Sequence, residues 1–374
     1  MSQLSTQAAD KLDKFKRRII GHPLLRGAFS QVMDRIEEPA GAEVAAVIGP
    51  TGSGKTTLGD RVKQTILTQN AAAMQANLSL LPVIAVDAPA PDTGSFSWRE
   101  VYLRILMELK EPVCDWQLAL KDRPAGKPGV ARLHSLNPIE LKGRVESAFR
   151  SRGVKVLLMD EAQHVGKMAS GRRLQDQTDT LKALAKSTGA FVVLLGTYEL
   201  IPLLELSGQV ARRFAWVHLP RYRCAVPQEW RDFQTAIRSF AAEIQPAEVP
   251  DLVRHAEMLY RGSVGCVGIL KSWLTMAYSQ VLRSNGDVLT QAVLQATCLP
   301  TSSLRKIMGE IEEGERHWAS SHGEDRELDG LLGLPSLHPA QAEPGQTRSP
   351  APRSIPVGMR KPTRDPIGVE AAAA

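Results

Sequence analysis

Short, almost continuously apolar runs alternate with amphipathic stretches along the first two thirds of the chain. Such runs are typical of strands that are buried on both faces of a sheet, and they lie at residues 43–48, 81–87, 154–159, 190–195 and 216–219. Between them, apolar residues recur at helical spacing at residues 57–69, 96–109, 139–151 and 178–187. This alternation predicts an α/β fold in which a parallel sheet is the middle of three αβα layers.

The segments on either side of this pattern differ from it. Residues 11–38 predict a helical lead-in with a basic start, interrupted at His22-Pro23. From about residue 227 to residue 317 the strand signals stop, and helical periodicity predicts a small all-helical lid domain. Eight of the 24 prolines then fall between Pro335 and Pro366, a composition typical of disorder. We therefore expect four parts: residues 1–38, 39–226, 227–318 and 319–374.

The first apolar run leads into a complete phosphate-binding loop. The stretch matches G-x-x-x-x-G-K-[ST] between a predicted strand and a predicted helix, the context that this motif requires. Backbone N–H groups at such a helix start can surround phosphates, a lysine reaches the β- and γ-phosphates, and a hydroxyl binds Mg²⁺. The predicted nucleotide-binding residues are Gly49, Pro50, Thr51, Gly52, Ser53, Gly54, Lys55, Thr56 and Thr57, with Thr56 as the magnesium ligand.

The third apolar run ends in two adjacent carboxylates, Asp160 and Glu161. With a phosphate loop upstream, Asp160 is expected to hold Mg²⁺ through water, and Glu161 to act as the base that polarises the attacking water. A small-molecule kinase would not need Glu161 at this position. The pair therefore favours hydrolysis of ATP over phosphoryl transfer to another substrate.

Three further features carry candidate chemistry, each with a structural alternative. Thr197, after Gly196 at the end of the fourth apolar run, is placed to contact the γ-phosphate and the water, or simply ends the strand. Arg213, or Arg212 beside it, would reach the γ-phosphate of a neighbouring subunit, or is a surface charge. Lys271, after a glycine-rich stretch that opens a lid helix, would contact nucleotide, or that stretch is a tightly packed turn.

Composition adds little to this picture. The formal net charge of +6 and the pI near 9.2 favour a polyanionic partner without establishing one. The four cysteines are widely separated, which argues against a zinc site or a disulfide framework. The first ten residues lack the apolar core of a signal peptide, and no apolar run is long enough to span a membrane. We therefore expect a cytoplasmic protein.

Together, the order of these motifs resembles that of the AAA+ ATPase superfamily. Within it, three strings resemble the TniB/TnsC family of ATP-dependent regulators of DNA transposition: Met159–His164, Leu195–Glu199 and Ser207–Phe214. The similarity extends over about residues 15–300. Strings of the type Asp-Glu-Ala-Gln-His also occur in secretion-associated ATPases of the ExeA kind, but those normally carry a membrane segment.

The resemblance implies both partners and a mechanism. ATP-bound subunits would assemble with Mg²⁺ into a ring or helical filament around duplex DNA, with each nucleotide at a subunit boundary. The assembly would respond to a target-selection protein and recruit a transposase, and hydrolysis would disassemble it. Two alternatives share much of this chemistry: another AAA+ loader or remodeller, such as a helicase loader, and a signalling or scaffold NTPase that does not bind DNA.

In such an assembly, basic side chains would contact the DNA backbone without reading its sequence. The candidates, each also readable as a solvated surface charge, are Arg99, Arg104, Lys121, Arg123, Lys127, Arg132, Arg172 and Arg173. The C-terminal part is not a polycation, because its acidic side chains offset its basic ones. Residues 358–368 in it are either a short docking motif for a partner protein or part of an inert linker.

Overall fold

The computed structural model describes residues 5–91, 94, 96–110, 136–167, 172–205, 214–244, 252–284, 289–322 and 332. The chain divides into two units, residues 1–323 and 324–374, and every helix and strand discussed below belongs to the first. The second unit has a single described residue, Leu332, which is exposed. The segment 358–368, either a docking motif or part of an inert linker, therefore lies outside the described residues.

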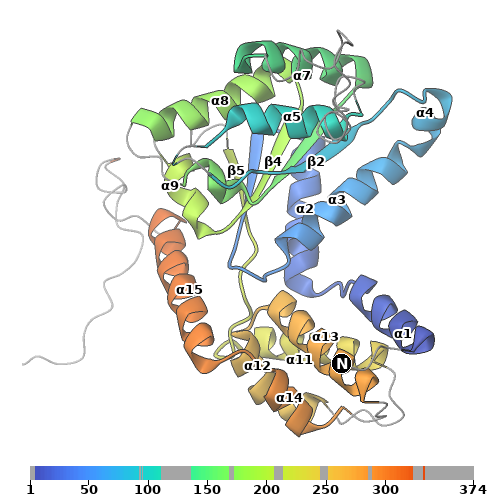
Figure 1. The fold of residues 1–374 in the computed structure, drawn as a ribbon. Helices are drawn as coiled ribbons and strands as arrows, with labels where there is room; N and C mark the ends of the chain where they lie inside the picture. The colour runs from blue at the N-terminus through green and yellow to red at the C-terminus, as the bar shows by residue number, and fades with distance from the viewer. Residues whose placement is uncertain are drawn as a thin grey trace, which may run out of the picture. The chain divides into compact units, whose positions relative to one another are not determined.

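The first unit contains a five-stranded parallel sheet with the strand order β2-β3-β4-β1-β5 (Figure 1). The strands are β1 (Val44–Ile48), β2 (Val83–Asp87), β3 (Val156–Asp160), β4 (Phe191–Gly196) and β5 (Phe214–His218). All five predicted strands are confirmed, with ends that differ from the predictions by at most two residues. Differences of two residues occur at the starts of β2, β3 and β5.

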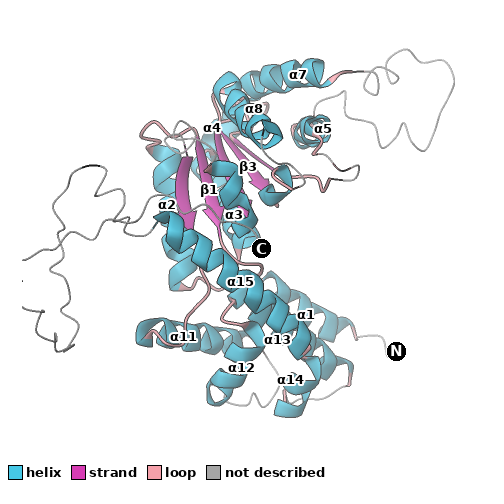
Figure 2. Cartoon of the chain, turned by 90° about the vertical axis from the view of Figure 1, so that its left-hand side faces the viewer, coloured by secondary structure: helices cyan, strands magenta, loops and turns pink. Residues whose placement is uncertain are grey.

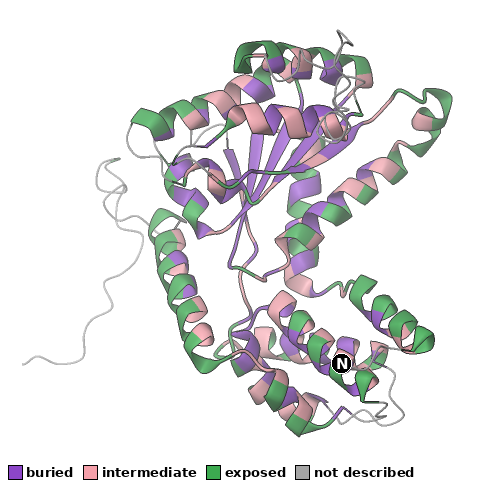
Figure 3. Cartoon of the chain, in the orientation of Figure 1, coloured by how far each residue is buried: buried purple, intermediate pink, exposed green. Residues whose placement is uncertain are grey.

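Helices cover both faces of this sheet, as the apolar runs predict (Figures 1 and 3). On one face lie α5 (Trp98–Glu108), α7 (Pro138–Arg152) and α8 (Arg172–Thr188), and on the other lie α2 (Pro23–Glu37) and α3 (Lys55–Gln69). Alternate residues of each strand contribute to the two cores: Ala46 and Ile48 of β1 face the first, and Ala45 and Val47 face the second. The expected αβα arrangement is therefore confirmed.

Local signals set where these helices begin and end. In α7, the Asn137 side chain accepts from the backbone N–H of Glu140 while the Glu140 carboxylate accepts from that of Asn137, which is a capping box. The helix ends at Gly153, whose φ of 61° is in the left-handed region. The weaker start of α8 was missed, because of its first six residues only Leu174 is a buried apolar residue.

The remaining elements are short or helical. Near the sheet lie α4 (Ala71–Ala76), the 3-10 helices η2 (Ala162–Val165) and η3 (Tyr198–Leu200), and α9 (Ile201–Leu204). The helical part that follows β5 is visible in Figure 2. It consists of α11 (Pro227–Glu243), η4 (Leu252–His255), α12 (Ala256–Ser263), α13 (Val267–Arg283), α14 (Gln291–Thr297) and α15 (Thr301–His322).

The two lead-in helices pack on different cores. In α1 (Thr6–Arg17), Phe15 is 1% exposed and its ring lies 6.2 Å from that of Phe240 in α11 and 5.7 Å from that of Tyr278 in α13. By contrast, α2 buries Val32 and Met33 in the core formed with α3 and the sheet. The break at His22-Pro23 is thus the point where the chain passes from the helical part to the sheet.

The last helix, α15, contacts the region around the carboxyl end of β4. Glu315 accepts two hydrogen bonds from the Arg221 guanidinium, at 3.0 and 3.1 Å, and the Trp318 ring stacks on His218 with centroids 4.5 Å apart. Gly314 lies directly on the Tyr198 side chain, where an added Cβ would overlap the ring. Tyr198 cannot easily move aside, because its hydroxyl is 2.9 Å from Nε2 of His218. Gly309, also in α15, differs from Gly314, because a Cβ added to Gly309 would have no atom within 4 Å.

This contrast gives a matched test of how α15 packs. We expect Gly314→Ala to destabilise the protein by about 1–3 kcal/mol, the usual cost of overpacking a fitted contact. Gly309→Ala should instead stabilise it by about 0.5–1 kcal/mol, because alanine favours a helix and no neighbour is displaced. Chemical denaturation of both variants measures the difference. Equal effects of the same sign would contradict this packing.

Candidate functional site

The loop between β1 and α3 has the geometry of a phosphate cradle. Gly54 is the N-cap residue of α3 and has a φ of 107°, a left-handed conformation that a Cβ would disfavour. Because Gly54 has no side chain, it cannot cap the first N–H groups of α3. These groups and the positive end of the helix dipole are suited to bind an anion.

Lys55 is the first residue of α3, and its side chain reaches back to the start of this loop. Its Nζ donates to the backbone oxygens of Gly49, at 2.9 Å, and Pro50, at 2.7 Å. Burial lowers the pKa of Lys55 to about 8, and the carboxylates of Asp160 and Glu161 oppose this shift. A phosphate that replaced the two carbonyls would give the ammonium a charged partner and stabilise its protonated form.

Thr56 and Asp160, the predicted magnesium ligands, are in direct contact. The Thr56 hydroxyl donates to Oδ2 of Asp160 at 2.6 Å, although 104 residues separate them in sequence. Hydroxyl and carboxylate oxygens are hard ligands of the kind that Mg²⁺ prefers, alongside water and phosphate oxygens. The two side chains therefore fit a magnesium ion bound between the phosphate loop and β3.

Glu161 and Thr197 are joined through a residue that sequence reasoning did not select. Glu161 has a φ of 52°, and its N–H donates to Oδ1 of Asp160 at 2.8 Å. The Gln163 amide donates from Nε2 to Oε2 of Glu161 and accepts at Oε1 from the N–H of Thr197, 3.2 Å away. Its sequence signals are its place two positions after the predicted base and its position in the string Met159–His164, and neither of them assigns it a role.

A cavity of about 580 Å³ opens beside these residues. Its walls include Pro50 and Thr51 of the phosphate loop, Gln163, Thr197, and Glu310 and Glu313 of α15. The predicted γ-phosphate end of the site thus faces carboxylates from the last helix. Sequence reasoning missed this contribution, because nothing in the helical periodicity of α15 indicates which distant element it meets.

The glycine-rich stretch before α13 meets the phosphate loop directly. The N–H of Gly268 donates to the carbonyl of Gly52 at 2.8 Å, and a Cβ on Gly268 would lie only 2.6 Å from that oxygen. The expected helix start is confirmed at Val267. Lys271, the candidate nucleotide contact on this helix, donates from Nζ to the carbonyl of Lys16 at 2.8 Å, so it binds the C-terminal end of α1.

A smaller pocket of about 40 Å³ lies on this side of the loop and is lined in part by His22, Ser53, Thr57 and Lys271. Burial, and secondarily Arg26, lowers the pKa of His22 to about 4, so the ring is neutral at physiological pH. Its Nδ1 lies 3.0 Å from the Tyr222 hydroxyl. Within the described residues, the buried hydroxyl of Ser53 has no hydrogen-bond partner.

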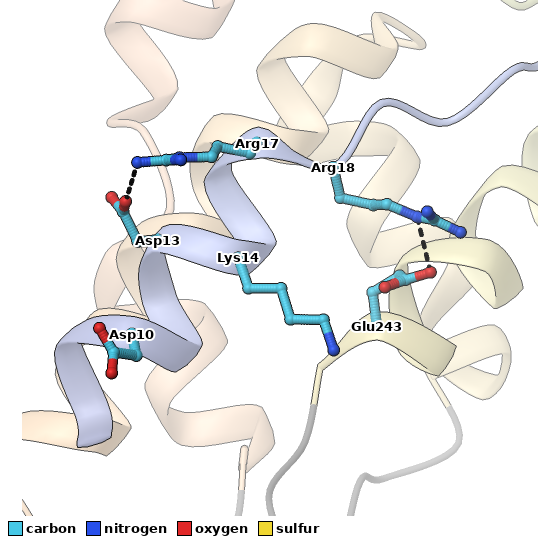
Figure 4. Close-up of a pocket in the computed structure, with 6 residues that line it drawn as sticks. All are labelled: Asp10, Asp13, Lys14, Arg17, Arg18 and Glu243. Atoms are coloured by element: carbon cyan, nitrogen blue, oxygen red, sulfur yellow. Dashed lines mark hydrogen bonds and ion pairs between the residues drawn. The ribbon is translucent and has the colours of Figure 1, made fainter.

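A separate hollow of about 540 Å³ lies between α1 and the end of α11 (Figure 4). Its charges are largely paired: Arg17 binds Asp13 at 2.8 Å, and Arg18 binds Glu243 at 2.7 Å. It contains none of the predicted nucleotide-binding residues.

The structure describes some of the other predicted site residues and not the rest. Arg212 and Arg213 lie outside the described residues, as do Lys121, Arg123, Lys127 and Arg132. Of the rest, Arg99 lies on α5 and has a partner within the protein, and Arg104 donates to Glu100 and, at 2.9 Å, to the carbonyl of Asp87. Arg172 and Arg173, in the first turn of α8, are exposed.

The described residues also bear on membrane-spanning helices, metal sites and reactive cysteines. Within the described part of the chain, no helix has the length and apolar character needed to cross a membrane. The same residues contain no group of three or more histidine, cysteine or acidic side chains placed to hold a metal ion. Cys224, Cys266 and Cys298 are free thiols, and burial raises the pKa of Cys266 to about 12, so it stays protonated.

The two carbonyl contacts of Lys55 lead to a test with a matched control. Lys55→Ala should weaken ATP binding by about 10- to 100-fold, because it removes a charge-assisted contact to phosphate. The control is Lys63→Ala on the same helix, whose amine is paired with Glu108 at 2.7 Å and should leave affinity unchanged. Titration with a fluorescent ATP analogue measures both variants. If Lys55→Ala binds the ATP analogue as tightly as Lys63→Ala does, the assignment of Lys55 is wrong.

Comparison with known proteins agrees with this geometry. The profile of the family described as AAA domain matches residues 38–204. No curated protein matches the chain. Among solved structures, the Aeropyrum pernix ORC2 protein, solved as ADPNP and ADP complexes, is similar with a TM-score of 0.51 and 15% identity, covering 85% of this chain and 87% of that one. This similarity is one of fold.

Two further solved structures are similar over most of their length. The Walker-type ATPase PABY2304 of Pyrococcus abyssi has a TM-score of 0.46 and 16% identity, with 81% of this chain and 80% of that chain covered. CDC6P of Pyrobaculum aerophilum has a TM-score of 0.48 and 13% identity, with 86% and 88% covered. The family match and the phosphate-loop fold agree: residues 38–204 match an AAA domain, the chain has the AAA+ P-loop NTPase fold, and it is an ATPase.

Proposed function

We propose that this ATPase regulates DNA transposition: with ATP it assembles on duplex DNA and recruits a transposase, and hydrolysis releases it. The observation that carries this proposal is that two of the strings that resemble the TniB/TnsC family meet at one site. Glu161 and Gln163 of the first string are hydrogen-bonded to each other, and Gln163 accepts from Thr197 of the second. The residues that carry the resemblance therefore include the predicted base and the predicted γ-phosphate contact.

Each residue of the site has a role in the proposed reaction. Lys55 and the N–H groups at the start of α3 bind the phosphates and counter the charge of the transition state. Thr56 and Asp160 would hold Mg²⁺, which neutralises phosphate charge when bound. Glu161 orients the attacking water and accepts its proton as the water oxygen bonds to the γ-phosphorus. The bond from that phosphorus to the bridging oxygen breaks, so that ADP and phosphate leave.

The arginine pair at 212–213 provides the proposed link between hydrolysis and assembly. If a neighbouring subunit supplies an arginine to the γ-phosphate, an isolated subunit hydrolyses ATP slowly and an assembled one faster. The lifetime of the DNA-bound assembly is then set by Glu161 and by the neighbour's arginine. A target-selection protein and a transposase would act on this assembly.

Of the described DNA candidates, Arg172 and Arg173 are the best suited to a backbone contact. Both are exposed, whereas Arg104 is already bound to Glu100 and to the backbone of Asp87. Contacts to phosphates release counterions, so the affinity for DNA falls steeply with salt. The logarithm of the binding constant falls linearly with the logarithm of the salt concentration. Loss of two arginine–phosphate contacts makes this slope shallower by about 2.

The DNA part of the proposal is tested by binding of a fluorescent duplex to the full chain with ATP at several salt concentrations. Replacing Arg172 and Arg173 together by alanine should weaken binding and reduce the salt slope by about 2. The control replaces Arg305 and Lys306, two exposed basic residues of α15, and changes net charge equally. Equal losses in the two double variants would assign the effect to net charge alone. Salt-independent binding, or none, would favour the scaffold alternative.

The hydrolysis part is tested by Glu161→Gln. This variant should bind ATP normally and remain on DNA at least about ten times longer than the wild type, because loss of the base blocks the step that releases it. Dissociation after dilution into competitor DNA measures the lifetime. Rapid release of Glu161→Gln in the presence of ATP would contradict the assigned role.

A further inference from the structure

Gln163 is a buried polar side chain whose two ends contact two different predicted functional residues. It is 7% exposed, and it lies in η2, directly after β3. A buried amide must have hydrogen-bond partners, because an unpaired one costs about 1–3 kcal/mol. Both partners of this amide belong to the nucleotide site, one being the Glu161 carboxylate and the other the Thr197 backbone.

The contact with Glu161 completes the placement of that residue. Its backbone is already held, because its N–H donates to Asp160 at 2.8 Å and its carbonyl accepts from the N–H of His164 at 3.0 Å. These contacts leave the side-chain torsions of Glu161 undetermined. The donation from Gln163 to Oε2 therefore selects where the carboxylate lies.

The contact with Thr197 connects the same amide to the tip of β4. Gly196 lies so close to Gln163 that a Cβ there would be 3.0 Å from Oε1 and 3.3 Å from the backbone nitrogen of Gln163. The carbonyl of Gly196 in turn accepts from the N–H of Gly49 at 3.3 Å. The buried Thr197 hydroxyl has no hydrogen-bond partner within the described residues, and Thr197 is one of the residues that line the cavity beside the phosphate loop.

We propose that Gln163 is a positioning residue that couples Thr197 to Glu161. When the Thr197 hydroxyl contacts the γ-phosphate, the tip of β4 is fixed, and through it the Gln163 amide and the Glu161 carboxylate are fixed as well. The base is then oriented for water attack only when the γ-phosphate is in place. This inference rests on the roles proposed above for Glu161 and Thr197.

The size of the expected effect follows from the cost of misplacing a catalytic group. A displacement of about 1 Å lowers the rate by about 100-fold without removing any group that binds substrate. Gln163 makes none of the proposed phosphate contacts. Loss of its amide should therefore lower kcat by about 10- to 100-fold and change KM for ATP by less than about three-fold.

Two substitutions at Gln163 distinguish the loss of its amide donor from a change in the shape of its side chain. Gln163→Leu removes both hydrogen bonds. Gln163→Glu keeps the length and the acceptor toward Thr197 but places a carboxylate against Glu161, where the donor is lost. The matched control is Gln177→Leu in α8, a half-buried glutamine that accepts from the Trp98 indole and has no contact with the site.

The experiment measures steady-state hydrolysis, ATP affinity and thermal stability of the full chain for these variants, with Glu161→Gln as reference. Coupling predicts that both Gln163 variants lose kcat while KM and affinity stay near wild-type values, and that Gln177→Leu keeps the wild-type kcat. The double variant Gln163→Leu/Glu161→Gln should be no slower than Glu161→Gln alone, because both changes disable the same base. Gln163→Leu should still bind DNA with ATP.

Other results would overturn the inference. If the kcat of both Gln163 variants equals or exceeds that of the wild type while Glu161→Gln abolishes hydrolysis, Gln163 does not position the base. If Gln163→Leu and Gln177→Leu lose stability and kcat to the same extent, its role is only structural. If Glu161→Gln hydrolyses ATP at the wild-type rate, the inference fails together with the role of Glu161. A wild-type protein that never binds DNA would instead refute the transposition proposal and leave the kcat results standing.

Discussion

The site depends on the register of three parallel strands. Ile48 of β1 lies opposite Gly196 of β4, and Met159 of β3 lies opposite Leu194 of the same strand, so all three strands end at one edge of the sheet. That edge brings the phosphate loop, Asp160 and Thr197 together from distant parts of the sequence. The hydrogen bond of 2.6 Å between Thr56 and Asp160 is the direct result. A shift of register would separate these groups and remove the site.

Elements outside the sheet then complete this edge. Gly268 at the start of α13 donates to the carbonyl of Gly52 in the phosphate loop, and the Ile269 side chain packs against the same glycine. From the other side, Glu315 of α15 binds Arg221, which follows β5 and has a side chain that is 13% exposed. A nucleotide that shifts the phosphate loop would therefore act on α13.

Much of this arrangement was predictable from local sequence. The five buried strands follow from apolar runs. The phosphate loop follows from the spacing of its glycines and lysine between a predicted strand and a predicted helix. What was not predictable depends on long-range contacts. The string Met159–His164 contains Gln163 but gives it no role, and its proposed role comes from its hydrogen bond with Thr197 at the tip of β4. In the same way, the separation of α1 from α2 depends on Phe15 packing against α11 and α13. Helical periodicity indicates that a face is buried, but not which core it joins.

The proposed function requires that ATP in this site drives assembly on DNA. The most direct test is negative-stain imaging of the purified protein with plasmid DNA, in the presence of ATP, a non-hydrolysable analogue or ADP. The account predicts rings or filaments on DNA with ATP and the analogue, and none with ADP. Separate particles under all three conditions would contradict it and favour an ATPase that needs a protein client before it contacts DNA.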